Sequence, residues 1–170
     1  MRAFALATTL LLTVPALAHG RPVPESDWDE ATKLKLAQIM VGEADWHEPD
    51  HVAIAYVLAR RWPQFQQMHG PISFAWYIGM YSSVMKVDSK RTRWVRGLPW
   101  GDITGPYAKR WHRVVELVEA WGEGRVKDPC PDAAHWGGAM DRPGKSWEPV
   151  SCGLTKNIFY THRDRRVASR

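Results

Sequence analysis

One carboxylate, Glu43, occupies a position in the sequence that suits a catalytic acid. It falls between two apolar helical patterns, the first beginning at Ser26-Asp27-Trp28-Asp29 and the second at Pro49-Asp50. Trp46 follows closely, and buried surroundings favour the protonated form of a carboxyl group, which is the form that a general acid needs. We therefore predict that Glu43 donates a proton in catalysis. The alternative is an exposed glutamate at a frayed helix end.

The residues that follow Glu43 match the zinc-binding pattern H-E-x-x-H at positions 47–51. In zinc proteases both imidazoles project from one face of a continuous helix. Here Pro49 lies between His47 and His51, where it removes a backbone hydrogen bond and disfavours helix at Glu48. We interpret the match as fortuitous, His47 as a loop residue and His51 as a surface residue of the first helical turn. We expect no metal and no cofactor, although a zinc-dependent peptidase is an alternative whose third ligand would have to come from His69, His112 or His135.

Aromatic residues point to a carbohydrate partner. The chain has ten tryptophans, more than a core of this size needs, and flat apolar rings with an N–H suit the faces of sugars. On a helical pattern, Trp111 and Trp121 are interpreted as core residues. The substrate-binding residues that we predict are Trp46, His135, Trp136, Gly137 and Tyr160. The glycine permits close approach of a sugar, whereas the alternative for His135 and Trp136 is a packed pair beneath a disulfide loop.

The N-terminal segment predicts export. Residues 1–18 combine a cationic start, an apolar run and an Ala-Leu-Ala cleavage pattern, which is typical of a secretory signal peptide. The run is shorter than the roughly 20 residues that span a bilayer, so we expect a secreted or periplasmic protein without stable membrane insertion. Removal of this segment from the chain of 170 leaves 152 residues, enough for one domain, and we expect a monomer. The predicted parts are a signal peptide (1–18), a linker (19–25), a catalytic domain (26–162) and a basic tail (163–170).

Cysteine usage and charge agree with an exported protein. Two cysteines, Cys130 and Cys152, predict a single disulfide that closes a segment rich in proline and glycine. A loop of that length is worth about 3 kcal/mol in the chain-entropy model. The formal net charge of +5 suits an anionic polymer such as a bacterial cell wall. We do not expect nucleic acid as a partner, because the basic residues are scattered except in the tail.

Four helices and a small sheet are expected to position these residues. A third helix is predicted from Ser73 through Met85, and a fourth from Pro106 to Gly122 or Gly124. Residues 88–105, rich in glycine and proline, are predicted to form a long connection. Short β-type runs are predicted at 133–136 and 157–161. The predicted class is α+β, mostly helical and lysozyme-like, with a small C-terminal antiparallel sheet or hairpin.

Several short segments together resemble a known family. GEADW, DHVAIAYVLARRW, ISFAW, DPCPDAAHWGGAMD and NIFY follow one another, over about 120 residues, as similar blocks do in the cell wall hydrolase family that includes the SleB-like cortex-lytic enzymes. The resemblance implies a lysozyme-like fold and cleavage between N-acetylmuramic acid and N-acetylglucosamine, with Glu43 as the catalytic acid. The chain departs from the family at 45–47, Asp-Trp-His, and at Arg60-Arg61, where the family has Arg-Gly-Glu and Asn-Arg.

The chemistry of such a reaction leaves two routes open. Glycosidic cleavage needs an acid for the leaving oxygen and a group that handles the developing oxocarbenium charge. The 6-hydroxyl of muramic acid can serve the second purpose, and one glutamate then suffices to give an anhydro end. If a second carboxylate acts, the candidates are Asp45, Glu48, Asp102 and Asp141. A further alternative is a non-catalytic glycan-binding module, in which the tryptophans bind and Glu43 does no chemistry.

Overall fold

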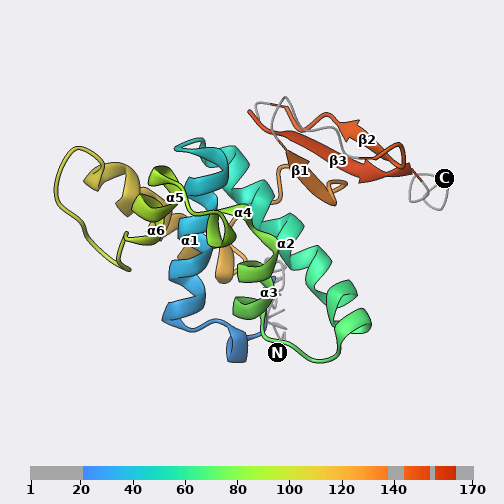
Figure 1. Cartoon of the computed structure of the whole chain (residues 1–170), viewed down its shortest axis with the longest axis horizontal. Helices are drawn as coiled ribbons and strands as arrows, with labels where there is room; N and C mark the ends of the chain where they lie inside the picture. Colours follow the sequence, from blue (N-terminus) through green and yellow to red (C-terminus); the bar gives the residue numbers. More distant parts are fainter. Residues whose placement is uncertain (1–20, 138–143, 154–155, 164–170) are drawn as a thin grey trace, which may run out of the picture.

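The computed structural model describes residues 21–137, 144–153 and 156–163. Helices pack together on one side of the molecule, and a three-stranded antiparallel sheet lies on the other (Figure 1). The elements are a 3₁₀ turn Glu25–Asp27, α1 Glu30–Ala44, α2 Glu48–His69, α3 Phe74–Tyr81, α4 Ser83–Lys86, α5 Lys90–Arg96, α6 Ala108–Gly122, β1 His135–Gly137, β2 Trp147–Val150 and β3 Ile158–His162. This arrangement confirms the predicted mostly helical α+β class. The predicted signal peptide lies outside the described residues, as does the basic tail after Arg163.

Helix α1 begins three residues later than its predicted start. Asp29 is its N-cap, with a side chain that accepts a hydrogen bond from the Thr32 amide at 2.8 Å. Ser26 instead lies in the preceding 3₁₀ turn. The prediction was wrong because two cap-forming residues stand three positions apart, and the chain forms a short turn before the helix. Glu43 is the penultimate residue of α1, so its place at a helix end is confirmed.

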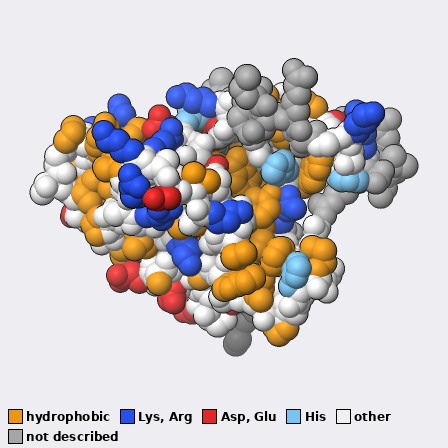
Figure 2. Space-filling model, in the orientation of Figure 1, with side chains coloured by type: hydrophobic (Ala, Val, Ile, Leu, Met, Phe, Trp, Pro, Cys, Tyr) orange, Lys and Arg blue, Asp and Glu red, His pale blue; other side chains and the backbone are white. Residues whose placement is uncertain are grey.

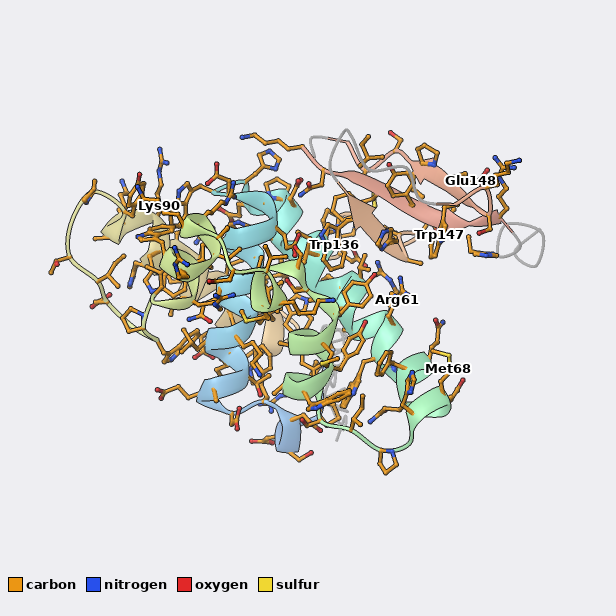
Figure 3. All side chains as sticks on the ribbon, viewed as in Figure 1. Arg61, Met68, Lys90, Trp136, Trp147 and Glu148 are labelled. Atoms are coloured by element: carbon orange, nitrogen blue, oxygen red, sulfur yellow. A yellow bond between two sulfur atoms is a disulfide. The ribbon has the colours of Figure 1, made fainter. Side chains whose placement is uncertain are left out.

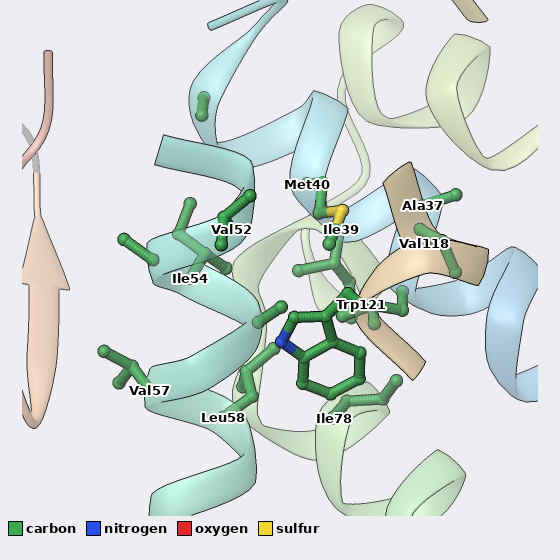
Figure 4. Close-up of a cluster of buried hydrophobic side chains, with 14 of the residues drawn as sticks. Ala37, Ile39, Met40, Val52, Ile54, Val57, Leu58, Ile78, Val118 and Trp121 are labelled. Atoms are coloured by element: carbon green, nitrogen blue, oxygen red, sulfur yellow. The ribbon is translucent and has the colours of Figure 1, made fainter. Parts of the chain in front are cut away.

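Tryptophan and aliphatic side chains fill the core between the helices. Trp121 of α6 lies among side chains from α1, α2 and α3 (Figure 4). It is fully buried, as is Trp111 of the same helix, so both are core residues as predicted. Leu36, Ile39 and Met40 of α1 are likewise fully buried. Because α1 packs against α2, α3, α4, α5 and α6, its C-terminal end is held from several sides.

Two predicted boundaries between Ser73 and residue 105 were wrong. Ser73 caps α3 as expected, but the helix stops at Ser82, whose extended backbone and hydroxyl start the separate helix α4. The predicted connection contains α5, which a reciprocal pair of hydrogen bonds between Ser89 and Thr92 caps. This capping box uses threonine in place of the more usual glutamate or glutamine. Helix α6 begins at Ala108 and ends at Gly122, close to the prediction.

The sheet has the order β1-β3-β2. Strands β1 and β3 lie within two residues of the predicted runs, whereas β2 was not predicted. Strand β2 contains Pro149, which is tolerated because β2 is an edge strand. A disulfide joins Cys130, before β1, to Cys152, after β2, as predicted. None of the helices in the described part of the chain is long and apolar enough to cross a membrane.

Candidate active site

Glu43 lies half-buried at the C-terminal end of α1. Its Oε1 accepts hydrogen bonds from the Ser82 hydroxyl at 2.7 Å and from the Ser83 hydroxyl at 3.1 Å. Both serines come from the break between α3 and α4, so the unpredicted break supplies the two groups that orient the carboxyl group. A hydroxyl can either donate or accept a hydrogen bond, and these contacts therefore suit both protonation states of the glutamate.

The Glu43 side chain lines a cleft of about 370 Å³ between the helices and the sheet. The other residues that line this cleft are Tyr81, Ser83, His135, Trp136, Gly137 and Asn157. A neighbouring cleft of about 490 Å³ shares Tyr81 and His135 with it. That second cleft is lined in addition by Arg61, Phe65, Met80, Lys86 and Trp147. The two clefts together form an open groove, with Glu43 toward one end and aromatic and cationic side chains toward the other. Figure 3 shows Trp136, Arg61 and Trp147 where the sheet faces α2.

A hydrogen-bond chain links α2, α3 and β1 across this groove. Arg61 Nη1 donates to the Tyr81 hydroxyl at 2.8 Å, and that hydroxyl lies 2.8 Å from His135 Nδ1. Arg61 can only donate, so the Tyr81 oxygen accepts from it, and the tautomer of His135 decides whether Tyr81 or Nδ1 donates in the second hydrogen bond. Burial raises the pKa of the Tyr81 hydroxyl, an effect that Arg61 opposes and the Glu43 carboxylate reinforces. The tyrosine thus stays neutral.

A buried carboxylate, Asp50, fastens the strand side of the cleft to the helices. It is fully buried in the first turn of α2 and accepts hydrogen bonds from the backbone amides of Lys156, at 3.0 Å, and Asn157, at 2.6 Å. The Asn157 side chain also lies 3.5 Å from the backbone carbonyl oxygen of Glu43. These contacts hold the residue before β3 against the end of α1, and Asn157 therefore forms part of the cleft wall.

The two histidines of the H-E-x-x-H pattern have structural partners. His47 is the residue before α2, and its Nδ1 lies 2.9 Å from Asp50 Oδ1. His51 is buried, so its prediction as a surface residue was wrong. Asp45 turns the chain with a positive φ of 58°, and the carbonyl oxygen of Asp45 lies 2.8 Å from His51 Nε2. Burial lowers the pKa of His51. Within the described residues, no three histidine, cysteine, aspartate or glutamate side chains come together as a metal site would require.

Three of the four candidate second carboxylates lie away from the Glu43 cleft. Asp45 is exposed and faces Arg91 at 3.9 Å, and Glu48 pairs with Arg113 at 2.8 Å. Asp102 is exposed beside His112. The fourth candidate, Asp141, lies outside the described residues. Among the described residues that line the two clefts of the groove, Glu43 is the one carboxylate.

The predicted substrate-binding residues divide into two groups. His135, Trp136 and Gly137 line the Glu43 cleft, and the rings of His135 and Trp136 also pack against each other with centroids 6.2 Å apart. Trp46 does not line that cleft and instead stacks on the ring of Tyr107. Tyr160 is buried in β3, opposite His135.

Sequence reasoning missed several residues of the groove. Arg61, Tyr81, Ser82, Ser83, Trp147 and Asn157 were not singled out as site residues. The sequence feature that could have pointed to Arg61 was the Arg60-Arg61 pair, because the cell wall hydrolases that the chain resembles have Asn-Arg at this position. Helix α2 continues past this pair to His69, so Arg61 projects from the middle of a helix and reaches Tyr81.

Comparisons with known proteins add no assignment. No family model, curated protein or solved structure matches the chain.

Proposed function

We propose that the protein is an exported enzyme that cleaves the glycan strands of peptidoglycan, as a lytic transglycosylase or muramidase with Glu43 as general acid and base. The observation that carries the proposal is the position of Glu43 in the cleft between helices and sheet, oriented by Ser82 and Ser83. A carboxyl group held in this way beside aromatic side chains is the arrangement that glycosidic cleavage needs. The resemblance to the SleB-like cell wall hydrolases points to the same residue.

Charge and ring chemistry along the groove support a peptidoglycan strand as the substrate. Trp136 and Trp147 offer flat apolar surfaces to sugar rings. Arg61 and Lys86 line the neighbouring cleft, where they would attract the lactyl carboxylate of muramic acid or the peptides attached to it. Such carboxylates distinguish peptidoglycan from the neutral polymer chitin.

The reaction can proceed with Glu43 alone. Protonated Glu43 donates its proton to the glycosidic oxygen, and the bond between this oxygen and C1 of the muramic residue breaks. The 6-hydroxyl oxygen of the same residue then bonds to C1, and its proton returns to Glu43. The carboxyl group is restored, and the product carries a 1,6-anhydro end. Attack by water in place of the 6-hydroxyl would yield a reducing end.

The Arg61–Tyr81–His135 chain has a positioning role in this proposal. It fixes the ring orientation of His135 at the boundary between the two clefts.

Substitution of Glu43 by glutamine tests the proposal. Glu43→Gln keeps the shape but cannot donate a proton as a carboxylic acid does, so cleavage of purified peptidoglycan should fall about 100-fold or more while sacculus binding persists. Mass spectrometry of the digest made by the unaltered protein should show 1,6-anhydromuramic ends if the 6-hydroxyl attacks and reducing ends if water attacks. The matched control is Glu30→Gln, at the exposed opposite end of α1, which should cleave normally.

Three outcomes would contradict the proposal. Undiminished cleavage by folded Glu43→Gln protein would place the acid elsewhere. Binding to sacculi without any cleavage by the unaltered protein would identify a glycan-binding module. Loss of activity on chelation, restored by zinc, would favour the peptidase alternative, which His47→Ala and His51→Ala variants would then locate.

A further inference from the structure

A second surface of the molecule gathers aromatic and cationic side chains next to the groove. We name the trio Trp46, Trp94 and Tyr107 the aromatic platform. Trp46 and Tyr107 stack with ring centroids 5.6 Å apart and planes 13° apart, and Trp94 meets both rings edge-on. Trp94 and Tyr107 each remain 42% exposed, so the platform presents apolar ring surface to solvent that the core does not use.

The platform borders two cavities that are rich in positive charge. A cavity of about 520 Å³ is lined by Lys90 and Arg91 together with the platform residues. A second cavity, of about 580 Å³, shares Asp45 and Trp46 with the first. It adds the cations Lys109, Arg110, Arg113 and Lys156.

The positive charge of this surface is largely uncompensated. The two cavities hold six lysine and arginine residues against two acids, an excess of four, whereas the whole chain has a formal charge of +5. Lys90, Lys109, Arg110 and Lys156 form no ion pair with any other residue in the described ranges. Figure 2 shows lysine and arginine gathered over the half of the molecule that holds α5. Cations left without partners beside exposed rings fit an anionic partner that also offers apolar faces.

The surface adjoins the Glu43 cleft along the chain. Asp45 and Trp46 follow Glu43 directly after α1, and Lys156 of the larger cavity precedes Asn157 of the cleft wall. Figure 3 shows Lys90 on one side of the molecule and Trp147 of the groove on the other, with Trp136 between them in this view. A polymer that occupied both sites would run from the Glu43 cleft past Trp46 to the platform.

We infer that the aromatic platform and its cations form a second, non-catalytic binding site for an anionic glycan, the muramic-acid polymer. The inference rests on the proposed function for the identity of the polymer. Sugar rings would stack on Trp94 and Tyr107, while Lys90, Lys109 and Arg110 would pair with carboxylates along the strand. Binding at this site would keep the protein on an insoluble polymer between cleavage events, because two contacts on one strand raise the effective local concentration.

Binding measurements on catalytically inactive full-length protein test the inference. In the Glu43→Gln background, sacculi and chitin are compared as probes, since chitin has a similar backbone without carboxylates. The double variant Trp94→Ala/Tyr107→Ala should weaken binding to both polymers about tenfold. The double variant Lys109→Gln/Arg110→Gln should weaken sacculus binding by a similar factor and leave chitin binding unchanged.

Matched controls and opposing outcomes complete the test. Trp76→Ala, with an indole 48% exposed elsewhere, and Lys127→Gln/Lys145→Gln, with exposed lysines outside both cavities, should bind as the parent does. Unchanged sacculus binding by the platform variants would overturn the inference, as would tighter binding of double-stranded DNA than of sacculi. If the unaltered protein cleaves no glycan but the platform variants lose sacculus binding, the proposed function fails and the inference stands.

Discussion

Replacing Asp50 by asparagine should loosen the strand side of the cleft. Both carboxylate oxygens are used, since Oδ1 accepts from the Lys156 amide at 3.0 Å and faces His47 Nδ1 at 2.9 Å, while Oδ2 accepts from the Asn157 amide at 2.6 Å. In Asp50→Asn one of these oxygens becomes an NH₂ group. Whichever way the amide is oriented, a donor then faces a donor in a fully buried site.

The size of the effect follows from the hydrogen bonds that are lost. A hydrogen bond to a charged group is worth about 1.5–3 kcal/mol, and a buried donor left without a partner adds a cost of similar size. We expect Asp50→Asn to lower the free energy of unfolding by about 3 kcal/mol. For a domain of this size, each kcal/mol lowers the Tm by about 2–4 °C, so the Tm should fall by about 6–12 °C.

Thermal unfolding and amide hydrogen exchange check this prediction. The Lys156 and Asn157 amides should exchange much faster in Asp50→Asn, whereas amides in the centre of α1 should change only with global stability. Asp132→Asn, an exposed loop substitution, is the control and should leave the Tm within about 1 °C. Unchanged protection of the Asn157 amide, or a Tm within that same range, would refute the anchoring role of Asp50.

Three further predictions concern packing, pH and the disulfide. Gly42→Ala would place its Cβ 2.3 Å from a valine side chain of α4 and should destabilise the protein by about 1–3 kcal/mol. Gly79→Ala, whose Cβ would make ordinary contacts, should be neutral or should stabilise the protein by up to about 1 kcal/mol. Chemical denaturation of the two variants measures both changes. The pKa of His51 is lowered by folding, so the unfolded chain binds more protons and stability should fall as the pH drops below about 6.5, by at most about 1.4 kcal/mol per pH unit. Subtracting the pH profile of His51→Gln from that of the unaltered protein should isolate this slope, and identical profiles would contradict it. Reduction of the Cys130–Cys152 disulfide should lower the free energy of unfolding by about 3 kcal/mol, and unfolding curves that coincide with and without reductant would show that the crosslink contributes nothing.

The helical part and the place of Glu43 could be predicted because they depend on local patterns. Apolar residues at helical spacing identify α1, α2 and α6, and the end of the first pattern locates Glu43. The capping residue of α1 was misplaced because Ser26 and Asp29 are equally good caps on sequence grounds. Strand β2 was missed because Pro149 is disfavoured in strands in general, and its edge position is visible only in three dimensions.

The groove was harder to predict because its contacts join distant segments. Arg61 reaches Tyr81 over 20 residues, and Tyr81 reaches His135 over 54. No periodicity or spacing rule connects such residues. The burial of His51 was also missed, since it depends on the unusual backbone at Asp45 that turns its carbonyl oxygen toward the imidazole. Sequence patterns thus identify the catalytic candidate but not the partners that orient it.

The order of the elements along the chain has a consequence for refolding. Glu43 lies in the first helix, whereas the facing wall of the cleft comes from β1 and the residues before β3, and Asp50 must close a loop of 107 residues to reach the Asn157 amide. Contacts that close long loops form slowly relative to helices. A chain with its helices already formed would therefore still lack a complete cleft. In refolding experiments the recovery of the proposed glycan cleavage should lag behind the recovery of helical circular dichroism, and the interval would measure how long the sheet takes to dock.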